Sequence, residues 1–147
     1  MPRFRSRLRR SSAATGFTRL DPGYTASQLS PLEQARRIAA IVSDKLARDV
    51  VILDMRPVCA YTDFFVVCSG QNARQTKSIV DEVRHGLKHG EERILPHTVE
   101  GDREGNWIVA DYLDVVLHVF TPDARAHYAL EDLWGDVPSV AVEAVSV

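Results

Sequence analysis

The sequence has few cysteines and no long hydrophobic run. Its two cysteines, Cys59 and Cys68, lack the spacing of a metal site, and such sparse use is ordinary in a reducing compartment. No stretch of about 18 or more apolar residues occurs, so no membrane-spanning helix is expected, and the basic N-terminal segment lacks the apolar core of a secretory signal. These absences predict a soluble chain with no membrane partner.

Charge is distributed unevenly along the chain, although the formal net charge is only −2. Residues 1–20 contain six arginines and no acidic residue, which leaves 12 Lys and Arg against 20 Asp and Glu in residues 21–147, a net charge of −8. We interpret residues 1–29, rich in Arg, Ser, Thr and Gly, as a flexible basic extension. It is either a solvated tail or the result of a misassigned start codon, or else an arm that touches RNA phosphates or an organellar transit peptide.

The rest of the sequence predicts one α/β domain. The 147 residues, 45% hydrophobic and 26% charged, suffice for a single core. Ser30, Pro31 and Glu33 form a capping-box pattern that starts a helix. We expect the order α-β-β-α-β-β-β-α, with a mixed sheet that carries helices, in a domain over residues 30–135 followed by a C-terminal tail over 136–147.

Apolar periodicity places the individual elements. The first helix runs for about four turns from Ser30, and the second begins at Ala73, where Asn72 and Gln75 suggest another capping box. A meander of adjacent antiparallel strands is expected over residues 97–120. The strands are predicted at 50–55, 64–68, 97–100, 107–111 and 115–120, and the last helix from Pro122 through Trp134, ending at Gly135.

Three groups of residues are candidates for a phosphate-binding, metal-binding or nucleophilic site, and none of them completes a known motif. The Ser69-Gly70 turn precedes a helix, but it lacks the glycine-rich phosphate-binding patterns, and Lys77 lies a full turn inside the helix. Asp111 and Asp114 are three residues apart, which places them around a turn or on opposite faces of a strand, as solvated turn acids or acids presented to a basic partner. Neither Ser69 nor Cys68 lies in a nucleophile motif. We expect no metal or other cofactor.

Two further features bear on the core and on an interface. Cys68 and His118 lie in apolar strands and are predicted to be core residues, His118 as a structural histidine. The C-terminal third also combines aromatic and acidic residues, which suit either a core or a protein interface. These residues are Trp107, Tyr112, Tyr128, Glu131 and Trp134.

An ordered series of short motifs resembles the ribosomal silencing factor family, also called Iojap-related. The most specific part is DVVLHVF at 114–120 followed by YALEDLWG at 128–135. The resemblance covers about residues 32–135. The other pieces are Asp54, TDFFVV at 62–67, SG at 69–70, RQ at 74–75, VEG at 99–101, WIVADY at 107–112 and Arg125.

The resemblance implies a nucleotidyltransferase-like topology without the catalytic acids of that superfamily, and a binding protein rather than an enzyme. Family members dock on the large-subunit ribosomal protein numbered fourteen, hinder the joining of the small subunit and lower translation when nutrients are scarce. Aromatic anchors and carboxylates would then meet a basic ribosomal protein. The implied interface residues are Trp107, Asp111, Asp114, Tyr128, Glu131, Leu133 and Trp134.

Other interpretations stay open at this point. One is a nucleotidyltransferase-like, magnesium-dependent enzyme that uses Ser69-Gly70 and nearby carboxylates; another is a homodimeric scaffold. The basic N-terminal segment is a candidate for contact with ribosomal RNA. We expect a bacterial cytoplasmic protein, with a mitochondrion or chloroplast as the alternative location.

Overall fold

A six-stranded mixed sheet forms the centre of the fold, and the computed structural model describes residues 29–133 and 137–142 of the chain. The strand order is β3-β4-β5-β2-β1-β6. This confirms the predicted α/β class with a mixed sheet and helices packed on it. In chain order the elements are α2 (Pro31–Asp44), β1 (Arg48–Asp54), β2 (Phe64–Ser69), α3 (Ala73–Lys88), β3 (Thr98–Glu100), β4 (Trp107–Asp111), β5 (Val115–Phe120), α4 (Pro122–Tyr128), α5 (Leu130–Leu133) and β6 (Ser139–Val140).

Both long helices begin at side-chain caps. At the start of α2, Ser30 Oγ accepts the Glu33 N–H (3.1 Å) and Glu33 Oε1 accepts the Ser30 N–H (3.0 Å), as the capping-box pattern predicts. At α3, Asn72 Oδ1 accepts the Gln75 N–H (3.0 Å), but the Gln75 side chain accepts the Gln71 N–H instead. The second box is therefore only half formed.

The sheet combines an antiparallel meander with one parallel pair. Strands β3, β4 and β5 are antiparallel neighbours, which confirms the meander. Strand β2 runs parallel to β5, in a register from Phe64 opposite Val115 to Ser69 opposite Phe120. The carboxyl ends of β2 and β5 consequently meet at one end of the sheet, and the turn between β4 and β5 lies at the other.

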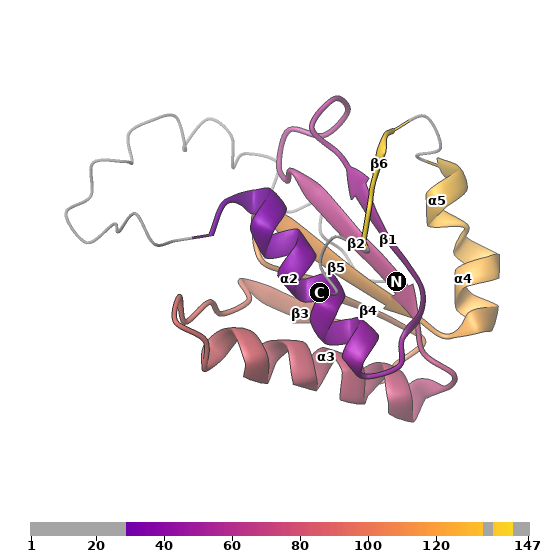
Figure 1. Ribbon diagram of the computed structural model, residues 1–147. Coiled ribbons are helices and arrows are strands. Elements are labelled where there is room, and N and C mark those ends of the chain that lie inside the picture. The colour runs from indigo at the N-terminus through magenta and orange to yellow at the C-terminus, as the bar shows by residue number, and fades with distance from the viewer. Residues whose placement is uncertain (1–28, 134–136, 143–147) are drawn as a thin grey trace.

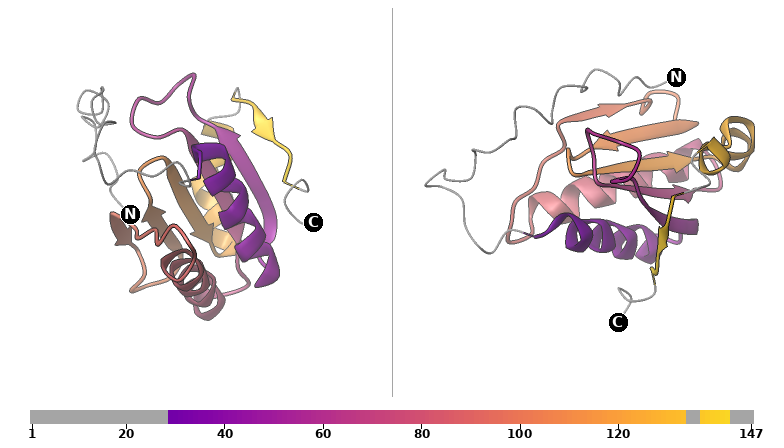
Figure 2. Two further views of the ribbon diagram at one scale, coloured as in Figure 1. Left: turned by 60° about the vertical axis from the view of Figure 1, so that its left-hand side comes forward. Right: turned by 90° about the horizontal axis from the view of Figure 1, so that it is seen from above.

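The sheet packs on different partners on its two faces. Helices α2 and α3 lie side by side over one face, which we call the α2–α3 face (Figure 1), while α4 and α5 lie at one end of the sheet, near the carboxyl end of β5 (Figure 2). Side chains alternate between the faces along each strand. The α2–α3 face contributes Phe64, Val66, Cys68, Ile108, Ala110, Val115, Leu117 and Val119 to one apolar cluster, and the opposite face contributes Leu53, Phe65, Val67, Trp107, Val109, Val116 and Phe120 to a second.

The prediction of one continuous last helix is wrong, because the chain forms two short helices, α4 and α5, in that region. Ala129 has a left-handed backbone (φ 46°), and its N–H donates to the Arg125 carbonyl, which closes α4. Helix α5 then starts at Leu130, whose side chain is buried in the second cluster. Alanine favours helices, so burial of Leu130 overrides the local preference. The predicted end of the helix, at Trp134 and Gly135, lies outside the described residues.

The segment predicted as an uninformative tail supplies a strand. In β6, Val140 pairs with Ile52 and Ser139 with Leu53, and the Asp54 N–H donates to the Pro138 carbonyl (2.9 Å). Strand β1 therefore has neighbours on both sides, and the sheet extends past residue 135. Among the described residues, no helix is long and apolar enough to cross a membrane.

Candidate functional site

A buried aromatic cluster surrounds Trp107 at the start of β4. The indole is 5% exposed, and its Nε1–H donates to His118 Nδ1 (3.1 Å). The ring centroid of Trp107 lies 5.1 Å from that of Phe120 and 4.7 Å from that of Tyr128. Tyr128 on α4 is 39% exposed, so it is the outer member of the cluster. Trp107 itself is a core residue in this structure, with Tyr128 between it and solvent.

His118 is fully buried on β5 and serves the packing of this cluster. Burial lowers its pKa from 6.5 to about 3, so the ring is neutral near pH 7 and Nδ1 can accept the indole N–H. The ring also lies against Phe65, with centroids 4.5 Å apart. The prediction of a structural histidine is confirmed. Cys68 is likewise buried, and burial raises the pKa of its thiol to about 12, as expected for a core cysteine.

Asp111 and Asp114 flank the turn that joins β4 and β5, as their spacing predicts. Asp111 ends β4 and is 1% exposed, and its Oδ1 accepts the Leu113 N–H (2.8 Å). Asp114 is half-buried, and its carbonyl oxygen accepts N–H bonds from Asp63 (2.9 Å) and Phe64 (3.1 Å). The two acids therefore build the turn and connect it to β2. Within the described ranges, no three His, Cys, Asp or Glu side chains are grouped to hold a metal ion.

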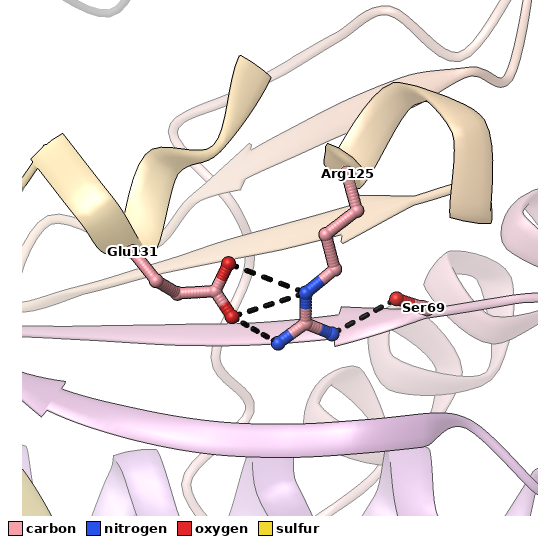
Figure 3. Close-up of polar contacts among 3 residues, drawn as sticks. All are labelled: Ser69, Arg125 and Glu131. Carbon is pink, nitrogen blue, oxygen red and sulfur yellow. Dashed lines mark hydrogen bonds and ion pairs between the residues drawn. The ribbon is translucent and has the colours of Figure 1, made fainter. Parts of the chain in front are cut away.

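A single guanidinium joins three elements at the opposite end of the sheet (Figure 3). Arg125 on α4 donates from Nη1 to Ser69 Oγ (2.8 Å), and from Nε to Glu131 Oε2 on α5 (3.0 Å). Its Nη2 makes a further ion pair with the same carboxylate. The side chains of Arg125 and Glu131 are 13% and 32% exposed. This clamp fixes α5 against the end of β2, and it supplies a counter-charge to Glu131 from within the chain.

The Ser69-Gly70 turn opens on a surface pocket of about 350 Å³ beside this clamp. Arg125 lines the pocket together with Arg48. The Ser69 hydroxyl accepts a hydrogen bond from Arg125, and the Gly70 N–H donates to the Phe120 carbonyl (2.8 Å). Two polar groups of the candidate phosphate turn are thus engaged within the protein.

The predicted interface residues fall into two groups at the two ends of the β4–β5 hairpin. Trp107, Tyr128 and Glu131 lie at the Phe120 end, while Asp111 and Asp114 lie at the turn. Trp107 and Asp111 are the two ends of β4, four residue steps or about 14 Å apart. Leu133 ends α5, and its side chain is not described; Trp134 lies outside the described residues.

Sequence reasoning missed the clamp as a structural unit. From the sequence, Arg125 is only part of the family resemblance and Glu131 an interface candidate, and nothing pairs the two. Their spacing of six residues does not match the three- and four-residue contacts of a helix. The pair forms because the chain turns at Ala129 between them.

Comparisons with known proteins extend over nearly the whole described domain. Residues 28–147 match the family described as "Ribosomal silencing factor during starvation". The ribosomal silencing factor RsfS of Halalkalibacterium halodurans is 40% identical over 104 residues, which are 71% of this chain and 87% of that protein. The protein named "Mitochondrial assembly of ribosomal large subunit protein 1" of Mus musculus is 30% identical over 120 residues, 81% of this chain and 52% of that protein.

A solved structure agrees with these sequence matches. The crystal structure of protein CV0518 from Chromobacterium violaceum superposes with a TM-score of 0.69 at 30% sequence identity. The superposition covers 78% of this chain and 94% of that chain. The α/β fold described above is therefore also found in a solved protein of related sequence.

Proposed function

Because this chain belongs to the ribosomal silencing factor family, we propose that it binds the large ribosomal subunit and represses translation by blocking the small subunit. The observation that carries the proposal is the family match over residues 28–147, which includes every described element. The name of the mouse relative refers to the same ribosomal subunit. The proposed mechanism is steric: a bound domain occupies space that the small subunit needs, and neither turnover nor a cofactor is required.

The proposed contact is the large-subunit ribosomal protein numbered fourteen. Residues 21–147 have a net charge of −8, which favours encounter with a basic protein and opposes binding to bare RNA phosphates. Exposure supports Tyr128 and the half-buried Asp114 as surface contacts, whereas Trp107 and Asp111 would act by supporting them from below. Glu131 already pairs with Arg125, so its contribution is the placement of α5 rather than a free negative charge.

Cosedimentation with purified large subunits tests this proposal. The protein should pellet with large subunits and reduce their reassociation with small subunits in a sucrose gradient. Absence of both effects would reject the function. Calorimetry with magnesium nucleotides examines the enzymatic alternative, since tight binding that depends on Asp111 would favour a nucleotide-using enzyme over a repressor.

Two variants locate the binding surface. Asp114→Lys should weaken large-subunit binding while the circular dichroism spectrum is unchanged, because a carboxylate facing a basic partner becomes a repelling cation. The matched control is Asp81→Lys, which makes the same charge change at an exposed residue of α3. Equal losses from both variants would mean that only net charge matters. Trp134→Ala is the corresponding test of an aromatic anchor.

We further propose that the protein acts in the bacterial cytoplasm. The relative from Halalkalibacterium halodurans is bacterial, while the mouse relative is named as mitochondrial. Mass spectrometry of the native N-terminus distinguishes the two locations, because import into an organelle would remove the arginine-rich segment. An intact segment is the expected result.

A further inference from the structure

The turn between β4 and β5 holds an exposed leucine in a conformation that leucine rarely adopts. Leu113 has φ 73° and is 41% exposed. The Asp114 N–H donates to the Tyr112 carbonyl (2.9 Å), two residues earlier. A positive central φ with this hydrogen bond defines the rare form of the γ-turn, which is strained for any residue with a side chain.

The surrounding structure fixes this conformation. Asp111 Oδ1 accepts the Leu113 N–H (2.8 Å), and the Tyr112 N–H donates to the Val115 carbonyl (2.8 Å). The Asp114 carbonyl in turn accepts the N–H groups of Asp63 and of Phe64, the first residue of β2. Leu113 is therefore presented at the tip of the hairpin by a network that would hold a glycine equally well. Left-handed backbone costs a residue with a Cβ about 1–2 kcal/mol.

The fold gains little in return for this strain. A leucine contributes to stability mainly through burial, and Leu113 is among the exposed large apolar residues. Strained residues that packing does not reward cluster at binding and catalytic sites. Leu113 also lies between Asp111 and Asp114, the two carboxylates proposed above to face or support contact with a basic protein. An exposed apolar side chain next to a surface carboxylate, here Asp114, fits an interface anchor with a polar rim.

We propose that Leu113 is an apolar anchor for the basic large-subunit protein that this chain binds. The inference rests on the proposed function. It adds a residue whose side chain strengthens binding but lowers the stability of the free protein. In the complex, the Leu113 side chain fills an apolar depression of the partner while the half-buried Asp114 carboxylate faces its cations, and Asp111 holds the turn from below. The strain in the free protein is then the consequence of keeping a leucine where glycine would be more stable.

The chain provides a matched control in Leu46. This residue also has positive φ (65°) and is 76% exposed. It follows α2, where its N–H donates to the Ser43 carbonyl (2.9 Å), a helix end that glycine normally occupies. Leu46 precedes Arg48, which pairs with Ser69 at one end of β2, whereas the Leu113 turn adjoins Phe64 at the other end. Both leucines have a positive φ and are exposed, Leu46 more than Leu113, but they lie at opposite ends of the sheet.

The experiment compares Leu113→Gly with Leu46→Gly in the full chain. Thermal unfolding and the dissociation constant for purified large subunits are measured for both. Relief of strain should keep or raise the unfolding midpoint in each variant, by up to about 5 °C. Only Leu113→Gly should weaken subunit binding, by about tenfold, the loss expected for one buried leucine side chain. Leu113→Met, which keeps an apolar side chain of similar volume, should retain most of the affinity.

Each result has a defined consequence. Unchanged affinity of Leu113→Gly, with a parent that binds normally, would overturn the anchor while the proposed function stands. Equal affinity losses in both glycine variants would show that backbone stiffness, not the leucine contact, matters. If the parent chain itself does not bind large subunits, the proposed function fails and the anchor fails with it.

Discussion

The two faces of the sheet differ in the kind of side chain that they bury. On the α2–α3 face the strands contribute aliphatic residues, Phe64 and a thiol, all packed against two long capped helices. On the opposite face lie all three buried polar side chains that the strands contribute, together with the indole of Trp107. These polar residues are Ser69, Asp111 and His118.

We infer that this difference separates the side chains that mainly stabilise the fold from those that hold the proposed binding surface in place. A close-packed aliphatic layer needs no particular partner and loses stability with each methyl group removed. Buried polar groups require specific hydrogen bonds, so the opposite face is ordered by the Trp107–His118 pair, the Asp111 turn and the Arg125 clamp. Each of those contacts fixes a segment that reaches the surface: α4, the Leu113 turn or α5. We therefore expect mutations on the two faces to have different effects.

The largest expected effect is on the α2–α3 face. Leu117→Ala removes a fully buried side chain from the middle of β5. The free energy of unfolding should fall by about 3 kcal/mol, from lost burial and the cavity left behind. Denaturant unfolding measures this, and the folded fraction should keep its affinity for large subunits. A loss of affinity at full folding would mean that the two faces are not separate in function.

The next largest effect is a pH dependence of the free energy of unfolding, caused by His118 on the opposite face. In the folded protein, burial lowers the pKa of His118 to about 3, against 6.5 for an unperturbed histidine. Between these values the unfolded chain binds a proton that the folded chain does not, so stability falls as the pH falls from 6.5 toward 3. The slope is at most about 1.4 kcal/mol per pH unit.

A comparison of variants isolates this contribution. Between pH 7.5 and 5, the parent should lose about 2 kcal/mol more stability than His118→Gln, whose amide oxygen can still accept the Trp107 N–H. Carboxylates also titrate in this range, but equally in both proteins. Parallel curves for the parent and His118→Gln would contradict the low pKa.

A smaller effect is expected at the Arg125 clamp. Arg125→Ala removes the hydrogen bond to Ser69 and the ion pair with Glu131, and should lower the free energy of unfolding by about 1–2 kcal/mol, because partial exposure of the pair weakens it. A double-mutant cycle with Glu131→Gln should give a coupling energy near 1 kcal/mol. Additive losses would show that the two side chains act independently.

Local chemistry made most elements predictable from the sequence. The capping box at Ser30 and the apolar runs of β2 and β5 needed only neighbouring residues, and the Asp111 to Asp114 spacing correctly placed a turn. The break at Ala129 could not be found in the same way, because no glycine or proline interrupts residues 123–134 and the cause is a contact made in the folded chain.

The candidate site was less predictable for the same reason. Aromatic and acidic residue types indicated an interface, yet composition alone could not tell that Trp107 is buried while Tyr128 covers it. The positive φ of Leu113 also has no signal in the sequence, since leucine is not a residue that normally occupies such a turn. Both features depend on tertiary packing and register.

The smallest effect on stability is expected at Tyr128, where the effect on binding should be large. Its ring lies 4.7 Å from Trp107 but is 39% exposed, so Tyr128→Ala should reduce the free energy of unfolding by no more than about 1 kcal/mol. As an interface aromatic it should weaken large-subunit binding about tenfold. His127→Ala, which removes the neighbouring ring 4.8 Å from that of Tyr128, should weaken subunit binding less than Tyr128→Ala does. A loss of more than about 2 kcal/mol in the free energy of unfolding, with normal binding, would instead make Tyr128 a core residue. The Trp107 cluster would then stabilise the fold without contributing to recognition, and the two faces would not differ in function there.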